Sequence, residues 1–327
     1  MASRNAPVIT AVAADPRVAV ALPSSRIEGF WGGAFRRLRR NRLAFASAIF
    51  IVAIALAAIL VPMLASTTYA DQDYDVVKQG PSRSHIMGTD QLGRDIFIRL
   101  IFGARISLTV GIVVQLVITV VGVPIGMLAG YAGGKTDTAI MRLVDVLYAL
   151  PSLLFVIIIM TFLRGTFDSK PGGIWGVIAD LDSKTGGLVG VYVGLGLISW
   201  LTVARIVRAN TMSLKQKEFV EAARGLGSGH RRIMSRHLLP NTIAAIVVAT
   251  TLGIPSAILT EAGISFLGLG VIPPMPSWGL MISEAIPNLR AHPYMLIFPA
   301  AALSLTVLAF NFLGDGLRDA LDPWMKR

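Results

Sequence analysis

Six long apolar runs, separated by shorter polar stretches, set the pattern of the chain. They cover residues 43–64, 107–129, 139–163, 188–207, 242–267 and 294–313. A helix of ~20 apolar residues is long enough to cross the hydrocarbon core of a bilayer. The pattern therefore predicts an all-α polytopic membrane protein with six transmembrane helices.

The composition supports this class. Hydrophobic residues make up 54% of the 327 residues and charged residues only 15%, which is unusual for a soluble domain. The net charge of +11 is concentrated beside the ends of the apolar runs, as in membrane proteins, so no nucleic-acid partner is expected. The chain has no cysteine, which excludes disulfides, thiolate metal sites and cysteine nucleophiles.

The distribution of basic residues predicts the topology. Residues 1–28 read as a flexible cytoplasmic tail, and residues 29–42, with five arginines, as a basic interfacial helix on anionic headgroups. Residues 43–327 form the six-span domain. Lys and Arg are frequent in the tail, at 205–236 and at the C-terminus, but scarce in the loops 66–95 and 270–292. The positive-inside rule therefore places both termini in the cytoplasm.

A polar interruption at 218–241, EFVEAARGLGSGHRRIMSRHLLPN, separates the fourth and fifth runs. Its residues Phe219, Ala222, Ala223 and Leu226 have the spacing of one apolar helix face. Gly227 and Gly229 are expected to end this helix with positive φ angles, and Pro240 to begin the next one. A short helix–turn–helix between spans has a side without lipid to face, which suggests docking on another protein. The alternative is a solvated amphipathic loop helix that binds nothing.

The same stretch resembles a known motif. Glu221-Ala222-Ala223, Gly227 and Leu239-Pro240 match the EAA loop of membrane subunits of bacterial ABC importers; His237 stands where that loop often has Ile. Further blocks resemble the dipeptide, oligopeptide and nickel permeases of this group. They are GTDQLGRD at 88–95, GARISL at 103–108, 145–151, EAGISFLGLG at 261–270, PSWG at 276–279 and 311–323.

This resemblance, from about Arg36 to Pro323, implies a non-catalytic permease subunit of an ATP-driven importer in the bacterial inner membrane. The coupling loop, residues 209–240, would be cytoplasmic and contact ATPase subunits through the EAA-loop residues. Those subunits would bind ATP and Mg²⁺, so no cofactor is expected in this chain. A second homologous permease and an extracytoplasmic substrate-binding protein are the other implied partners. Di- and oligopeptides are the expected substrates; nickel or another small solute is the alternative.

A few polar residues interrupt the spans. Glu261 and Gln115 are candidates for the substrate path, although a hydrogen bond between packed helices explains each of them as well. Asp145 is expected to pair with Arg142, one helical turn away, and Pro151 to kink the third span. The small residues Gly111, Gly122 and Gly126 are expected where the second span packs closely on its neighbours.

Structural roles are expected for the loops on the outer side. Gly88-Thr89-Asp90 is expected to form a tight turn, and the Arg94/Asp95 pair to cap the second span; contact with the substrate-delivering protein is the alternative. Residues 164–187 read as a Gly-rich outer loop.

Other classes of membrane protein lack support. The chain has no H-E-x-x-H metal motif, no G-x-x-x-x-G-K-[ST] nucleotide loop and no filter motif of a channel. Its four histidines lie in loops or at span ends, and no serine nucleophile with a partner base is recognised. No catalytic or metal-binding residue is expected, and a channel or membrane-embedded enzyme is the less favoured alternative.

Overall fold

The computed structural model describes residues 30–169 and 172–321, so the predicted tail at 1–28, Lys326 and Arg327 lie outside the described residues. The described residues form helices, with no strand among them. The elements are α1 Phe30–Arg40, α2 Arg42–Leu64, η1 Tyr74–Val76, α3 Ile96–Ala132, α4 Gly134–Tyr148, α5 Ser152–Asp168, α6 Gly173–Lys184, α7 Leu188–Lys215, α8 Glu218–Gly225, α9 His230–Ile233, η2 Met234–Leu238, α10 Leu239–Phe266, α11 Trp278–Ala285, η3 Ile286–Asn288 and α12 Tyr294–Leu321.

The helices that could cross a membrane agree with the six apolar runs. Five of them are long and apolar enough on their own: α2, α3, α7, α12 and the continuous helix His230–Phe266, which contains α9, η2 and α10. The helices α4 and α5 pass the same test only together, and they are bent by 84° at the short break between them. Pro151 lies in this break, as predicted, because it lacks a backbone N–H and disfavours helix in the residue before it. Counting the bent pair as one span gives six.

Several boundaries differ from the sequence prediction: α7 continues to Lys215 and α12 to Leu321, beyond the predicted ends at 207 and 313. The helix α3 begins at Ile96 instead of residue 107 and has 37 residues, or about 55 Å of helix. The region 164–187 is not a loop: α5 continues to Asp168, and α6 follows. In α6, Ile174, Val177 and Leu181 recur at helical spacing, a signal that the nearby glycines concealed. The helix α11 likewise lies within residues 270–292, where the sequence predicts a loop.

The helix α3 packs closely on α7 and α10 because glycines line its contact surfaces. A Cβ atom at Gly126 would lie 2.4 Å from the Ala204 carbonyl oxygen, and one at Gly122 would lie 2.9 Å from the Trp200 carbonyl oxygen. A Cβ at Gly111 would lie 2.7 Å from Cγ1 of Ile258 in α10. These approaches confirm the predicted packing role of the three glycines, since only a residue without a side chain fits there.

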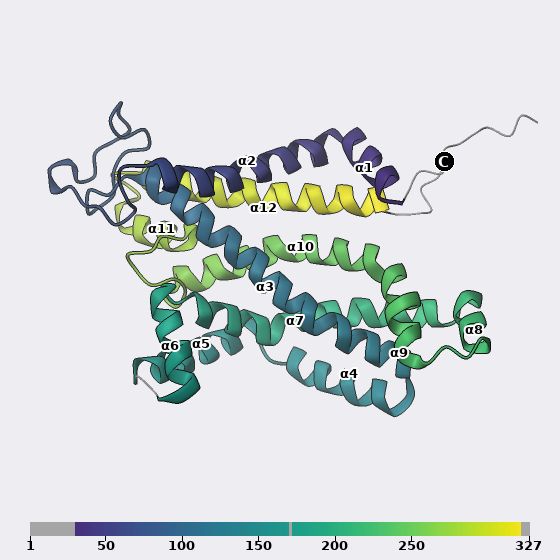
Figure 1. The fold of residues 1–327 in the computed structure, drawn as a ribbon. Helices are drawn as coiled ribbons and strands as arrows, with labels where there is room; N and C mark the ends of the chain where they lie inside the picture. Colours follow the sequence, from purple (N-terminus) through teal and green to yellow (C-terminus); the bar gives the residue numbers. More distant parts are fainter. Residues whose placement is uncertain (1–29, 170–171, 322–327) are drawn as a thin grey trace, which may run out of the picture.

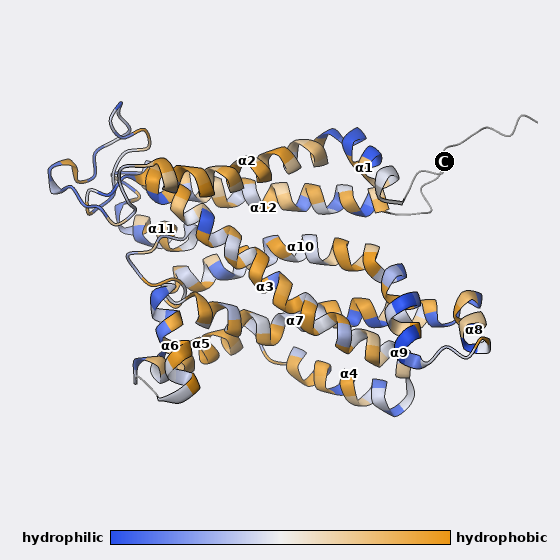
Figure 2. Cartoon of the chain, viewed as in Figure 1, coloured by the Kyte–Doolittle hydropathy of each residue, from blue (hydrophilic) through white to orange (hydrophobic). Residues whose placement is uncertain are grey.

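The molecule has two polar ends separated by apolar helix bodies (Figure 2). At one end lie α1, α8, α9 and the last turns of α12; at the other lie α6, α11 and the long connection between α2 and α3 (Figure 1). The predicted basic helix is present as α1, and its buried Ala34 packs with Ala320 and Leu321 of α12. Phe35, on another side of α1, is exposed.

A buried ion cluster fixes the connection between α2 and α3 to the helix bundle. Asp90 Oδ2 lies 2.6 Å from Arg94 Nε and 2.5 Å from Arg99 Nη1, and Glu284 of α11 lies within 3.2 Å of both arginines. Arg94 therefore does not act with Asp95 as predicted. Asp95 alone caps α3 by accepting a hydrogen bond from the Ile98 N–H. The turn expected at Gly88-Thr89-Asp90 lies earlier: the Gly88 N–H bonds to the His85 carbonyl, and Thr89 forms an extended bridge with Asp95. These contacts give residues 88–95 a structural role.

Candidate functional site

The segment α8–α9–η2 projects beyond the helix bundle at the end that also holds α1 (Figure 1). The helix α8 ends in a Schellman motif: the Ser228 N–H bonds to the Ala223 carbonyl and the Gly227 N–H to the Arg224 carbonyl. Gly227 has φ +79°, as predicted, but Gly229 has φ −69° and needs no glycine. Pro240 lies in the first turn of α10, as expected.

The predicted apolar face of α8 is only partly packed on the bundle. Val220 and Ala223 are buried in the main hydrophobic core. Phe219, Ala222 and Leu226, three of the four residues of the predicted apolar face, are exposed, and Leu226 is 87% exposed. Both faces have helical spacing, so periodicity alone did not distinguish them; packing against the bundle decided it.

The exposed side of α8 is available for contact with another molecule. Glu221 is exposed, and within the described part of the chain no cation lies within ion-pair distance of its carboxylate. Ala222 beside it is small, so a partner surface can approach the backbone. Leu239 is half-buried and Pro240 exposed where the segment joins α10. The predicted coupling residues thus lie on one short segment, with Ala223 on its inner side.

Tyr131, near the end of α3, attaches this segment to the bundle. Its hydroxyl lies 2.8 Å from Nδ1 of His230, the first residue of α9. The Lys215 ammonium at the end of α7 donates a 2.6 Å hydrogen bond to the Tyr131 carbonyl oxygen, where a cation also suits the helix C-terminus. The Arg224 guanidinium of α8 lies 5.7 Å from the centre of the tyrosine ring. No sequence pattern indicates these contacts, because the partners are far apart along the chain.

Glu261 of α10 is fully buried in a network of hydroxyl groups. It accepts a 2.5 Å hydrogen bond from the Ser265 hydroxyl and a 3.4 Å bond from the Ser107 hydroxyl of α3. Both hydroxyl oxygens in turn accept backbone N–H groups, from Val271 and Trp278 respectively. Glu261 therefore joins α10, α3 and the start of α11. It lines none of the cavities described below, which favours the packing interpretation over a place in the substrate path.

A central cavity of 660 Å³ lies among α3, α7, α10 and the break between α4 and α5. Gln115 is part of its wall, together with residues such as Leu147, Pro151, Ser199 and Ser256. Gln115 is buried, and its Nε2 finds no hydrogen-bond partner among the described residues. Nε2 therefore does not make the hydrogen bond to a neighbouring helix that was the predicted alternative.

An ion pair stands close to this cavity. Asp145 of α4 accepts a 2.6 Å hydrogen bond from Arg205 of α7, so it does not pair with Arg142 as its spacing suggested. The guanidinium of Arg205 also lies 4.2 Å from the ring centre of Tyr148, a cavity residue. The bend in the third span turns α4 along α7, which makes the partner on another helix nearer than the one on the same helix.

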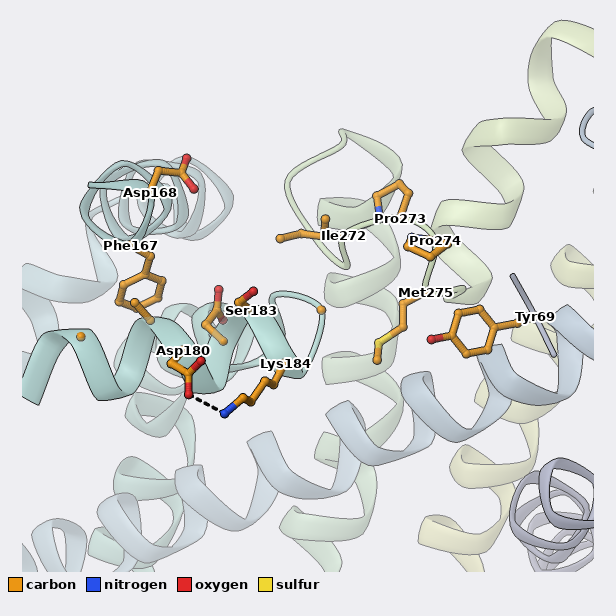
Figure 3. Close-up of a pocket in the computed structure, with 14 residues that line it drawn as sticks. Tyr69, Phe167, Asp168, Asp180, Ser183, Lys184, Ile272, Pro273, Pro274 and Met275 are labelled. Atoms are coloured by element: carbon orange, nitrogen blue, oxygen red, sulfur yellow. Dashed lines mark hydrogen bonds and ion pairs between the residues drawn. The ribbon is translucent and has the colours of Figure 1, made fainter. Parts of the chain in front are cut away.

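A second cavity, of 770 Å³, lies at the opposite end, between α6 and the segment after α10 (Figure 3). Its wall includes Asp168, Asp182 and the ion pair between Asp180 and Lys184, with Pro273, Pro274 and Met275 facing them. Asp182 has a structural role, since its carboxylate accepts a 2.8 Å hydrogen bond from the Gly190 N–H.

Comparison with protein families decides the class. Residues 122–327 match the family described as the binding-protein-dependent transport system inner membrane component, and residues 29–81 match the N-terminal TM domain of oligopeptide transport permease C. The chain belongs to the binding-protein-dependent permease family. This permease is thus an inner-membrane component of a transport system and not an enzyme, as the sequence predicted.

Relatives of this permease cover nearly its whole length. It is 40% identical over 304 residues to the oligopeptide transport system permease protein OppC of Bacillus subtilis (strain 168), with 93% of both chains covered. It is 42% identical to the glutathione transport system permease protein GsiD of Pectobacterium atrosepticum, covering 90% of this chain and 92% of that one. The dipeptide permease DppC of Alkalihalophilus pseudofirmus is 38% identical, with 90% of each chain covered.

A solved structure has the same fold as this permease. It is an inward-facing conformation of the MetNI methionine ABC transporter, with a TM-score of 0.54 and 18% sequence identity. The match covers 68% of this permease and 96% of the other chain. The predicted all-α fold of an ABC permease is thereby confirmed.

Proposed function

We propose that this permease imports di- and oligopeptides. In this proposal it forms half of a translocation path with a second homologous permease, and cytoplasmic ATPase subunits drive it. The single observation that carries the proposal is the α8 segment, whose outer side is exposed at one polar end of the bundle (Figure 1). The relatives named as oligopeptide, dipeptide and glutathione permeases support the substrate class.

The ATPase would bind to the outer side of α8. Glu221 offers a carboxylate to a basic partner, Ala222 permits close approach, and Leu226 offers an apolar side chain that is 87% exposed. Gly227 fixes the turn after α8, and Ala223 fixes α8 to the bundle. Leu239 and Pro240 connect the segment to α10. ATP and Mg²⁺ would bind to the partner, so the permease itself holds no cofactor.

The two polar ends would then face opposite sides of the membrane. The end with α8, the basic α1 and the last turns of α12 would be cytoplasmic, in accord with the excess of Lys and Arg there. The other end, with α6, α11 and the connection between α2 and α3, would face the extracytoplasmic substrate-binding protein.

Transport would follow from motion of α8 relative to the bundle. Closure of the ATPase subunits would displace α8, and the continuous connection through α9 and η2 would pass the displacement to α10. The segment η2 has π-helical hydrogen bonding, a local irregularity found at functional positions in helices. Because α10 forms part of the wall of the central cavity, its displacement changes access to the cavity.

A cysteine crosslink tests the coupling, since the chain has no cysteine of its own. An Ala222→Cys variant, reconstituted with its ATPase carrying a single cysteine in the contact surface, should crosslink in an ATP-dependent manner. Ala223→Cys is the matched control: the side chain is buried, so it should crosslink much more slowly. Equal crosslinking of both variants, or none from Ala222→Cys in an assembled transporter, would contradict the proposal.

The substrate class is tested by uptake into proteoliposomes that contain the complete transporter. A radiolabelled tripeptide should accumulate in the presence of ATP and the binding protein. Accumulation of nickel or another small solute without that of peptides would support the alternative substrate.

A further inference from the structure

The central cavity combines hydrogen-bonding capacity with an absence of charge. Of the described residues in its wall, none is Asp, Glu, Lys, Arg or His. Apolar side chains predominate, and its polar members are an amide, a phenol and hydroxyls: Gln115, Tyr148, Ser152, Ser199, Thr202, Ser256 and Thr260. Such a wall solvates neutral polar groups and apolar side chains alike.

One polar group in the wall has an unused hydrogen-bond donor. Gln115 is only 2% exposed, and within the described structure Nε2 has no acceptor. A buried donor without an acceptor is unfavourable, so its presence at a cavity wall indicates a ligand that supplies one. The Gln115 amide packs against the backbone of α10, since a Cβ at Gly253 would lie 2.1 Å from its Oε1.

Displacement of α10 from α3 would open this donor to the cavity. Pro255 interrupts the hydrogen bonding of α10 two residues beyond Gly253, so the helix is locally weakened where it covers the amide. A hydroxyl–hydroxyl contact of 3.1 Å between Thr119 and Thr250 also joins α3 to α10 here.

Two opposite charges beside this wall, those of Arg205 and Asp145, neutralise each other. Arg205 binds Asp145 through a 2.6 Å hydrogen bond, and its guanidinium covers the Tyr148 ring. The pair therefore presents no net charge to the cavity. A path that carried one sign of fixed charge would retain peptides of the opposite sign and repel those of the same sign.

We propose that the central cavity is an electrically neutral site for the backbone of a passing peptide, in which the Gln115 side-chain amide donates a hydrogen bond to a peptide carbonyl oxygen. The site binds the part that all peptides share and does not discriminate between charged side chains. This inference rests on the proposed function and specifies the ligand chemistry of the same path.

Charge substitutions at Ser256, an exposed residue of the cavity wall, test the neutrality. The probes are the tripeptides Ala-Asp-Ala and Ala-Lys-Ala, taken up by proteoliposomes containing the complete transporter. Relative to the neutral control Ser256→Asn, Ser256→Asp should change the ratio of lysine to aspartate peptide uptake by about tenfold, and Ser256→Lys should change it about tenfold in the opposite direction. The direction itself depends on whether entry or release limits the rate, but the two variants must differ in sign.

The use of ratios separates a specific effect from structural damage. Damage lowers the uptake of both peptides together, whereas a change in the charge of the path changes their ratio. Ratios that stay within about twofold of the Ser256→Asn value in both charge variants would overturn the proposal, whatever happens to the total rate.

The hydrogen bond of Gln115 is tested separately. A Gln115→Leu variant should lower the maximal uptake rate of both tripeptides by about tenfold without changing their ratio, because it removes a donor to the shared backbone. A tripeptide with N-methylated amides keeps its carbonyl oxygens, so it should show the same loss. Unchanged uptake by Gln115→Leu would overturn the role of this side chain. If the unaltered transporter carried neither tripeptide, the proposed function itself would fail.

Discussion

The Ser265 hydroxyl donates a 2.5 Å hydrogen bond to Oε1 of Glu261, and both residues are fully buried. Ser265 also accepts the Val271 N–H, so the backbone after α10 turns back onto the carboxylate. A Cβ at Gly270 would lie only 1.9 Å from the Ser265 hydroxyl oxygen, which explains the glycine. The block from Glu261 to Gly270 is thus one local structure organised around a buried acceptor.

Replacement of Glu261 should therefore affect stability more than transport specificity. Glu261→Ala leaves two buried hydroxyls without their acceptor and should lower the free energy of unfolding by about 1–3 kcal/mol per unsatisfied group. Glu261→Gln keeps an acceptor oxygen and should lose less. Thermal unfolding in detergent measures the difference, with exposed Glu218→Ala as a control expected within about 0.5 kcal/mol of the wild type. Loss of transport by a stable Glu261→Gln protein would instead restore Glu261 to the substrate path.

Loss of one carboxylate should also destabilise the ion cluster at the other polar end. Asp90→Asn removes the anion that binds both Arg94 and Arg99, and leaves two buried guanidinium groups with Glu284 alone. Breaking a buried pair in this way should cost about 3–5 kcal/mol. Asp75→Asn changes an exposed residue of the same connection and should be neutral. Limited proteolysis between α2 and α3 reports the effect, and equal resistance of the two variants would count against it.

Addition of one methyl group at Gly126 should force α3 and α7 apart. In Gly126→Ala the new Cβ would approach a backbone oxygen at 2.4 Å, so the helices must move apart, at a cost of about 1–3 kcal/mol. Gly165→Ala is the matched control, because no atom lies within 4 Å of a Cβ there and alanine favours the helix. Melting temperatures of the two purified proteins test this, with Gly126→Ala expected to be the lower. A Gly126→Ala protein as stable as Gly165→Ala would show that the contact is looser than described.

Reversal of the charge on α8 should uncouple the transporter. Glu221→Lys is expected to reduce ATP-dependent uptake by at least about tenfold while membrane insertion is unchanged, because the side chain is exposed and supports no contact within the described residues. Asp319→Lys makes the same charge change on an exposed residue of α12 at the same polar end. Uptake and membrane content are measured together. Similar losses in both variants would point to general electrostatics and not to docking through α8.

The two glycines after α8 should respond differently to proline. Gly227 has φ +79° and its N–H closes the Schellman motif, whereas proline fixes φ near −65° and lacks this donor. Gly227→Pro should therefore abolish uptake without preventing insertion. Gly229 has φ −69°, so Gly229→Pro should be tolerated. Tolerance of Gly227→Pro in the uptake assay would show that the shape of this turn is not needed for coupling.

Periodicity and composition determined most of the fold from the sequence alone. A span needs a continuous run of apolar side chains, which is a local property of the sequence. Helices therefore form at Arg42–Leu64 and Tyr294–Leu321 over the runs predicted at 43–64 and 294–313, although the second helix extends beyond its run. Local backbone chemistry was equally readable: Gly227 ends α8 with a positive φ, and Pro151 breaks the third span. The small residues of α3 were recognisable because close helix approach excludes larger side chains.

Only the tertiary structure decided which side chains meet. Asp145 had Arg142 at a suitable spacing but binds Arg205, because the 84° bend brings α4 along α7. Val220 and Ala223 are the buried residues of α8, while Phe219 and Leu226 are exposed, because both pairs have helical spacing and only packing decides which side faces the bundle. The partners of Glu261, Tyr131 and Gln115 come from distant helices, and a pattern along one chain does not contain distances between helices. The sequence determined the elements and their class, and packing determined the site.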